Sequence, residues 1–236
     1  MELGEIFSDA LVYPFYNIKA LILYLILGII LGIAIVGTVL AVGAGSTINN
    51  IWAVIGSGII GIIVALFIGF LINGYQLDIV KYGIERNVGS PGIDPIRQFI
   101  NGVKLFAVQI IYMIIPIIIG SILAIIFQHW LSGLITFIIS IIFSFALVMA
   151  QCRLAKTEDI GNALAIGDAI GDISRVGILK LVLFIIILVI ITLVLYFIVT
   201  LIAKWNATVG GILLGILSVY LIFFEGRALG LLYSNV

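Results

Sequence analysis

Residues 181–203 read LVLFIIILVIITLVLYFIVTLIA, which is 23 consecutive positions without a charged side chain. About 20 apolar residues in a helix are needed to cross a bilayer core roughly 30 Å thick. Five further stretches are of this kind: Ala20–Val42, Ile51–Asn73, Leu105–Phe127, Trp130–Met149 and Val209–Phe224. The runs are continuous rather than alternating, which favours helices over a β-barrel. The sequence therefore predicts an all-α membrane protein with six transmembrane helices.

The composition of the whole chain agrees with this class. Of its 236 residues 64% are hydrophobic and 9% are charged, whereas a soluble domain is about a quarter charged. Membrane lipids are therefore the expected surroundings, and the net charge of zero gives no reason to expect nucleic acid as a partner. The single cysteine, Cys152, excludes an intrachain disulfide and a cysteine-based metal cluster. No cofactor is expected.

The charged residues are sorted to one side of the spans. Every Lys and Arg except Lys204 lies in a chain end or in one of the two long connections, Gly74–Lys104 and Ala150–Lys180. By the positive-inside rule this side is cytoplasmic, so both termini of a multipass protein in the cell membrane are expected inside. Five basic residues at span ends are expected to act as interface anchors: Lys19, Lys104, Arg153, Lys180 and Arg227. The span Val209–Phe224 is short, and its helix is expected to continue past Glu225, with the charged ends of Glu225 and Arg227 reaching the interface.

An internal repeat is visible in the connections. Aliphatic–Lys pairs precede three spans at Ile18-Lys19, Val103-Lys104 and Leu179-Lys180, and Arg153-Leu154-Ala155 resembles Arg227-Ala228-Leu229. These matches predict one integral membrane domain over residues 1–236. It is built from three parallel hairpins around a pseudo-threefold axis, with repeats at approximately 1–85, 91–157 and 160–236.

The segments before the spans are expected to be amphipathic helices in the headgroup plane. In Asp94–Lys104, Asp94 suits an N-cap and Pro95 suits the first helical position, while Ile96 and Ile100 fall on one stripe. Ile160–Arg175 contains three glycines, which predicts a broken helix. The stretch Asn87–Gly92 is expected to be a turn.

These features resemble a known family. Gly74-Tyr75 followed by Lys81 and Arg86, a Gly- and Pro-rich turn, a later Arg153 segment and a closing Glu225-Gly226-Arg227…Gly230…Tyr233 look like the domain of unknown function 4013. The turn here, Pro91-Gly92-Ile93-Asp94-Pro95, replaces a Leu-Pro-aromatic pattern. The resemblance implies a six-span membrane protein of mainly archaeal, especially methanogen, distribution. It implies no reaction, substrate or site residue.

Small residues recur at helical spacing within the spans. The pattern Gly56-Ser57-Gly58-Ile59-Ile60-Gly61 matches a dinucleotide fingerprint in letters, but it lies inside a span rather than between a strand and a helix. Close packing of helices is the better interpretation. The candidate packing positions are Gly28, Gly32, Ser57, Gly61, Ala65, Gly69, Gly211 and Gly215.

A stripe of hydroxyl side chains follows one face of the fourth span, at Ser132, Thr136, Ser140 and Ser144. It could line a polar path, although such hydroxyls more often bond to the carbonyl one turn back. His129 stands without a carboxylate or second ligand nearby, so it predicts an interfacial hydrogen bonder. Asn206-Ala207-Thr208 is a glycosylation sequon.

No catalytic, cofactor-binding or metal site is predicted, because no span carries a charge near its middle and no cluster of reactive side chains is present. The leading hypothesis is a non-catalytic role in membrane organisation or as an accessory subunit, in an oligomer with itself or with other membrane proteins. The alternative is a channel or carrier for a small neutral solute. A third hypothesis is a lipid-modifying enzyme that uses Asp168, Asp172 and Arg175.

Overall fold

The computed structural model describes residues 1–48, 50–127, 130–205 and 207–236, and it describes the side chains of these except at 36, 207, 208, 211 and 212. The described residues form helices α1 (Leu3–Tyr16), α2 (Ile18–Thr47), α3 (Ile51–Ile84), α4 (Pro95–Ile126), α5 (Trp130–Thr157), α6 (Ile160–Leu164), α7 (Ile166–Val176), α8 (Ile178–Trp205) and α9 (Ala207–Tyr233). The predictions made for His129 and Asn206 lie outside the described residues.

The predicted class is confirmed. Within the described ranges, six helices are long and apolar enough to cross a membrane, namely α2, α3, α4, α5, α8 and most of α9. The protein is therefore a multipass membrane protein. These helices run beyond the predicted spans, and α3 continues without interruption from Ile51 to Ile84.

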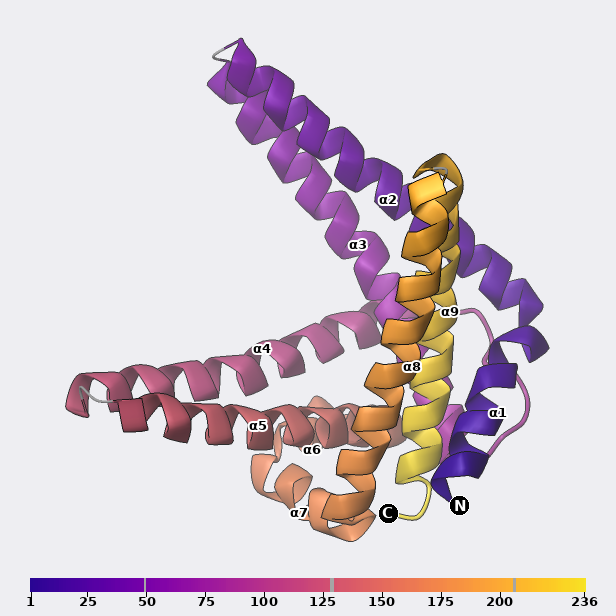
Figure 1. Ribbon diagram of the computed structural model, residues 1–236, viewed down its shortest axis with the longest axis vertical. Coiled ribbons are helices and arrows are strands. Elements are labelled where there is room, and N and C mark those ends of the chain that lie inside the picture. The colour runs from indigo at the N-terminus through magenta and orange to yellow at the C-terminus, as the bar shows by residue number, and fades with distance from the viewer. Residues whose placement is uncertain (49, 128–129, 206) are drawn as a thin grey trace.

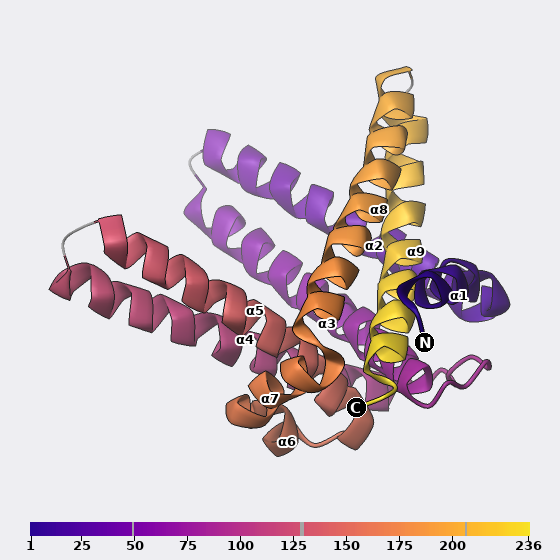
Figure 2. The same ribbon diagram turned by 60° about the horizontal axis from the view of Figure 1, so that its bottom comes forward.

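The long helices pair into the hairpins α2–α3, α4–α5 and α8–α9, which diverge from a common end of the molecule (Figures 1 and 2). We call this common end the junction and define it as residues 1–24, 74–108, 144–188 and 217–236. It contains α1, α6, α7 and both chain termini (Figure 1). It also contains every charged residue of the chain except Lys204.

The packed core lies mainly in the junction. One cluster of buried side chains brings together Phe7 of α1, Met149 of α5, Phe184 of α8 and Phe224 of α9. A neighbouring cluster is aromatic, with the rings of Tyr24 and Tyr75 stacked at 4.3 Å between centroids. Away from the junction the hairpins separate, and side chains such as Ile33, Ile60 and Ile125 are more than half exposed.

The stretch before the third span differs from the expected interfacial helix. Asp94 caps it by accepting a hydrogen bond from the Arg97 backbone N–H, and Pro95 is its first residue, as predicted. However, it is the first part of α4 and continues directly into the membrane helix. Its polar residues Gln98 and Asn101 are buried, and Ile96 is 77% exposed. Packing against α3 orients this segment, because α3 offers a buried carboxylate that needs polar partners.

The remaining connections follow the sequence more closely. Helix α6 ends at Leu164 and α7 begins at Ile166, which confirms the predicted break in Ile160–Arg175. Residues 87–92 lie between α3 and α4 as a non-helical connection. The described long helices form hairpins, while the internal repeat and its threefold symmetry stay predictions.

Candidate functional site

The junction is tied together by Asp–Arg ion pairs, each of which joins two different helices. Arg227 of α9 pairs with Asp9 of α1 at 2.6 Å, Arg97 of α4 with Asp78 of α3 at 3.0 Å, and Arg153 of α5 with Asp172 of α7 at 3.1 Å. Asp78 and Asp172 are 3% and 0% exposed. Removing one partner of such a pair would leave a buried charge uncompensated. These pairs therefore fix which helices meet at the junction.

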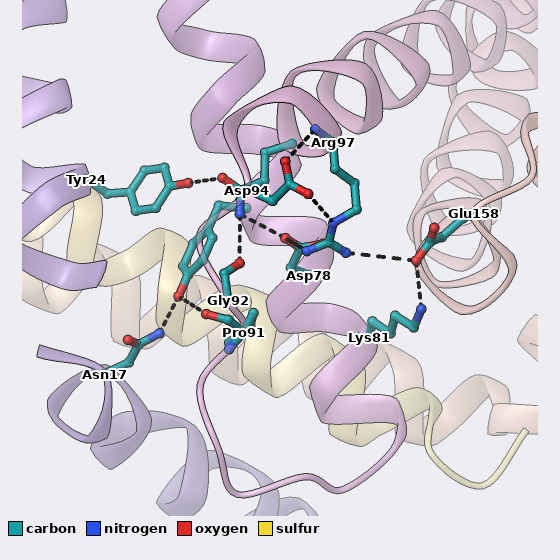
Figure 3. Close-up of polar contacts among 11 residues, drawn as sticks. Asn17, Tyr24, Asp78, Lys81, Pro91, Gly92, Asp94, Arg97 and Glu158 are labelled. Atoms are coloured by element: carbon teal, nitrogen blue, oxygen red, sulfur yellow. Dashed lines mark hydrogen bonds and ion pairs between the residues drawn. The ribbon is translucent and has the colours of Figure 1, made fainter. Parts of the chain in front are cut away.

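The Asp78 pair belongs to a polar network between α3 and α4 (Figure 3). The guanidinium of Arg97 and the amide of Gln98 both donate to Asp78 Oδ2, at 3.0 and 3.1 Å. Asp94 and Glu158 lie on the other sides of the same guanidinium, at 3.8 and 4.0 Å. The first turn of α4 thus supplies both donors that satisfy the buried carboxylate.

The network continues from Gln98 to the first two helices. Tyr24 of α2 donates to Gln98 Oε1 at 2.6 Å, and Gln98 Nε2 also donates to the Gly92 carbonyl at 3.2 Å. Asn17, between α1 and α2, donates to the hydroxyl of Tyr75, which donates to the Pro91 carbonyl at 3.4 Å. The connection between α3 and α4 is held in place by these bonds.

Glu158 joins three elements of the chain. Its side chain accepts from Lys81 of α3 at 2.7 Å, and its backbone carbonyl accepts from Lys104 of α4 at 2.7 Å. It follows α5 in a left-handed backbone conformation, with φ of 56°. The hydrogen bond from Lys81, with the nearby charges of Arg97 and Lys104, lowers the pKa of Glu158 below its usual value of 4.5.

Arg227 is 2% exposed and bonded on several sides. Besides Asp9, its guanidinium donates to the carbonyls of Tyr82 at 3.3 Å and Asn87 at 2.6 Å. The ring of Tyr13 lies 4.7 Å from its carbon centre, a distance typical of a cation–π contact. Burial raises the pKa of the Tyr13 hydroxyl, and Arg227 opposes that shift. Arg227 is thus held inside the protein instead of extending to a headgroup region.

Arg153 closes the junction between α5 and α7. It donates to Asp168 at 3.0 Å, to Asp172 at 3.1 Å and to the Asn162 carbonyl at 2.9 Å. Arg175 and Tyr233 also donate to Asp172, at 2.8 and 2.5 Å. Both oxygens of Asp172 are therefore occupied, so the hypothesised Asp168–Asp172–Arg175 site is a set of structural contacts here. Over the described residues, no group of three or more His, Cys, Asp or Glu side chains could hold a metal ion.

The remaining predicted anchors are divided. Lys104 bonds to the Glu158 carbonyl, and Lys180 donates to the Met1 carbonyl at 3.2 Å, so both join parts of the junction. Lys19 is exposed.

Glycines allow backbones to meet in the junction. A methyl group added to Gly74 would overlap the Gln98 carbonyl, and one added to Gly102 would overlap the Phe70 carbonyl, so α3 and α4 touch backbone to backbone. Gly83 of α3 and Gly230 of α9 are in similar mutual contact.

The predicted packing positions behave unequally. A methyl group added to Gly61 would overlap Thr38 of α2, and one added to Gly28 would come within 3.0 Å of Val219 of α9. Gly32, Gly69 and Gly215 face open space. Ser57 donates to the Ala53 carbonyl of its own helix at 2.6 Å, and Ala65 is half-buried. The packing of Gly211 lies outside what the structure describes.

The hydroxyl stripe is satisfied within α5. Thr136, Ser140 and Ser144 each donate at 2.8 Å to the carbonyl one turn back, at Ser132, Thr136 and Ser140. Ser140 and Ser144 also border a groove of about 210 Å³ between α4 and α5. The donor bonds of these hydroxyls stay within their own helix, and their oxygens remain available as acceptors.

A cavity of about 320 Å³ lies where α3, α5, α8 and α9 meet. Its polar lining consists of Gln76, Ser144, Gln151 and Glu225. Gln76, Gln151 and Glu225 each stand two residues before a junction ion-pair residue, namely Asp78, Arg153 and Arg227. The second helix of every described hairpin thus contributes a Gln or Glu to the lining, and α5 contributes Ser144 as well.

Glu225 differs from the other buried or half-buried acids of the junction. Asp9, Asp78, Glu158 and Asp172 all pair with Arg or Lys, whereas Glu225 has no ion-pair partner within the described part of the chain. It was expected to reach the interface, but it lines the cavity together with Phe184, Leu188 and Leu229. From the sequence, Glu225 is expected at the end of a span, because the pattern of one helix does not show how α9 packs against α8.

Comparison with known proteins adds a family. A family model described as "Protein of unknown function (DUF4013)" matches residues 57–204, which is well over half of the chain. The chain belongs to the DUF4013 family. The resemblance seen in the sequence is thereby confirmed. No curated protein and no solved structure matches this DUF4013 protein.

The cavity is the feature that the sequence prediction missed. The matched region of this DUF4013 protein includes Gln76 and Gln151 with their neighbours Asp78 and Arg153. A signal was present in the sequence, because the same two-residue spacing occurs after each hairpin. This recurrence is hard to recognise in the sequence, because the first hairpin has Asp78 at the position where the other two have Arg153 and Arg227.

Proposed function

We propose that this DUF4013 protein is a non-catalytic multipass membrane protein that organises the membrane or serves as an accessory subunit, and that it works as an oligomer. The supporting observation is a division of the molecule into a polar junction and apolar outer hairpins. The carboxylates of Asp9, Asp78, Glu158 and Asp172 are occupied by Arg, Lys, Gln or Tyr donors. Such groups serve assembly of the helices rather than acid–base or metal chemistry.

The outer hairpins support self-association. They diverge from the junction (Figure 2). They expose large side chains, including Ile62 at 60%, Ile125 at 75% and Phe197 at 63%. Lipid chains or other helices must fill the space between diverging hairpins, because water is absent from the membrane core. Gly32, Gly69 and Gly215 face open space, so these positions allow close approach by helices of a second copy. We further propose that the junction and both termini lie on the cytoplasmic side, following the distribution of Lys and Arg.

Cross-linking in a native-like bilayer tests the oligomer. Ile62→Cys places a thiol on the exposed outer part of α3, and Ile79→Cys places one at a fully buried position of the same helix. In nanodiscs, Ile62→Cys is expected to give covalent dimers with a bifunctional maleimide, whereas Ile79→Cys is expected to give no covalent dimer. Native Cys152 is buried and should not react. A particle with the 25.5 kDa mass of one chain, without any copurifying protein, would contradict the proposal.

A channel or carrier for a small solute is the second candidate, and the cavity favours it. The cavity has contributions from each described hairpin, as expected for a path along the predicted threefold axis. Solute flux into proteoliposomes measures this activity directly. Absence of flux for uncharged solutes that fit the cavity would remove this candidate.

A further inference from the structure

We propose that the cavity between α3, α5, α8 and α9 is a binding site for a small organic ammonium ion, with Glu225 as the counter-charge. This inference goes beyond the proposed function, because it assigns a ligand class to one site and holds for a monomer or an oligomer alike. It rests on the charge, the acceptors, the walls and the volume of the cavity.

The charge comes from Glu225. Its carboxylate faces a cavity with apolar walls and has no Lys or Arg partner in the described structure, whereas the neighbouring acids are paired. The Thr192 hydroxyl lies close enough to this carboxylate to donate a hydrogen bond to it, and it has no other partner among the described atoms. An ionised carboxylate in such surroundings is costly, and a bound cation would stabilise it in place of a proton. The cavity thus lacks a positive group.

The other polar groups can accept hydrogen bonds from that positive group. Gln76 and Gln151 carry amide oxygens, and Ser144 keeps acceptor capacity because its own hydrogen goes to the Ser140 carbonyl. A primary ammonium has three N–H donors. The carboxylate together with the Gln and Ser oxygens provides more than enough acceptors for all three.

The walls and the volume select an organic ion over a metal ion. Phe145, Val148, Phe184, Ile185, Leu188 and Leu229 form the apolar lining. Hard metal cations take six or more oxygen ligands at short distance, which this lining does not supply. A volume of about 320 Å³ lies at the small end of ligand pockets and suits a compact apolar body. Anions are disfavoured because the lining has a carboxylate and no basic side chain.

Benzylammonium is a suitable probe, with benzyl alcohol as the uncharged control for partition into lipid. Binding to the protein in nanodiscs is measured by isothermal titration calorimetry. The wild type is expected to bind benzylammonium at least tenfold more tightly than benzyl alcohol. Glu225→Gln should lose at least tenfold in affinity for benzylammonium, while Glu85→Gln, which alters an exposed acid of the junction, should bind like the wild type.

A second variant keeps the test independent of the charge. Leu188→Trp fills the cavity without altering any charge, and it is expected to abolish binding while gel filtration shows an intact particle. Equal binding by the wild type and Glu225→Gln would overturn the proposal. So would tight binding by Leu188→Trp, absence of benzylammonium binding, or a response to sodium or potassium ions alone.

Discussion

Glu158 connects helices that are far apart in the chain. Its side chain accepts a hydrogen bond from Lys81 of α3, and its backbone carbonyl accepts one from Lys104 of α4. Glu158 itself lies directly after the end of α5. A residue with this role could not be identified from the sequence, since it stands in a charged segment that would be equally suitable for a solvated loop. Only the folded geometry brings its partners within bonding distance.

The lowered pKa of Glu158 predicts a pH dependence of stability. Because the folded protein binds this proton less readily than the unfolded chain, the ion pair stabilises the fold above about pH 4.5, and this contribution is lost as the pH falls through the lowered folded-state pKa. Thermal unfolding of the wild type and Glu158→Gln in detergent measures it. The wild-type advantage is expected to be constant between about pH 5.5 and 7 and to shrink below about pH 4.5. A pH-independent difference would contradict this role.

For two arginines of the junction, the sequence predicts the side of the membrane but not the carboxylate with which each one pairs. Arg153 and Arg227 were expected at an interface, and the structure gives them buried or half-buried carboxylates instead. Asp9 and Arg227 are separated by 218 positions in the sequence. Hydropathy predicts the side of the membrane on which a charge lies, because the cost of burying it in lipid is a local property. Pairing depends on how hairpins meet, which is not local.

Helices α3 and α4 pack through glycines that periodicity alone did not single out. The predicted stripe on α3 runs through Ser57, Gly61 and Gly69, whereas the contact with α4 is made by Gly74 beyond the predicted end of the span. The span boundaries were set by apolar length, and the helix itself continues into the charged junction. Element type was therefore predictable, while the packing face was only partly so.

Gly74→Ala tests this contact. The added methyl group would overlap the Gln98 carbonyl, so α3 and α4 must separate, and the expected loss is about 2 kcal/mol in the free energy of unfolding. Gly69→Ala on the same helix faces open space and is expected to be neutral or stabilising by up to about 1 kcal/mol. Thermal unfolding of both variants in the same detergent compares them. Equal midpoints would show that the close contact carries no energetic weight.

For the molecule as a whole, the class and the hairpin order were predictable from the sequence. Apolar length and the sorting of charge depend on the large cost of placing ionic groups in hydrocarbon, which overrides weaker preferences. The divergence of the hairpins was not predictable, because it depends on contacts confined to one end. The central cavity was missed for the same reason, since its lining comes from several hairpins.

Cysteine accessibility tests the proposed orientation. Ser46→Cys lies at the end of α2 away from the junction, and Ser90→Cys lies in the connection between α3 and α4. An impermeant maleimide added to intact cells is expected to label position 46 and not position 90, because the basic connections are proposed to be cytoplasmic. Permeabilised cells should show labelling at both. Labelling of both positions in intact cells would contradict a membrane span between them.

The contact between α1 and α9 has a consequence for biosynthesis. Tyr220 of α9 donates to the Leu11 carbonyl of α1, and Arg227 pairs with Asp9. Among the described helices, α1 is therefore synthesised before the helix against which it docks, α9. Until α9 has been synthesised, α1 lacks this docking surface, and Asp9 lacks its arginine partner. Synthesis of α9 is thus the step that allows α1 to pack in the junction.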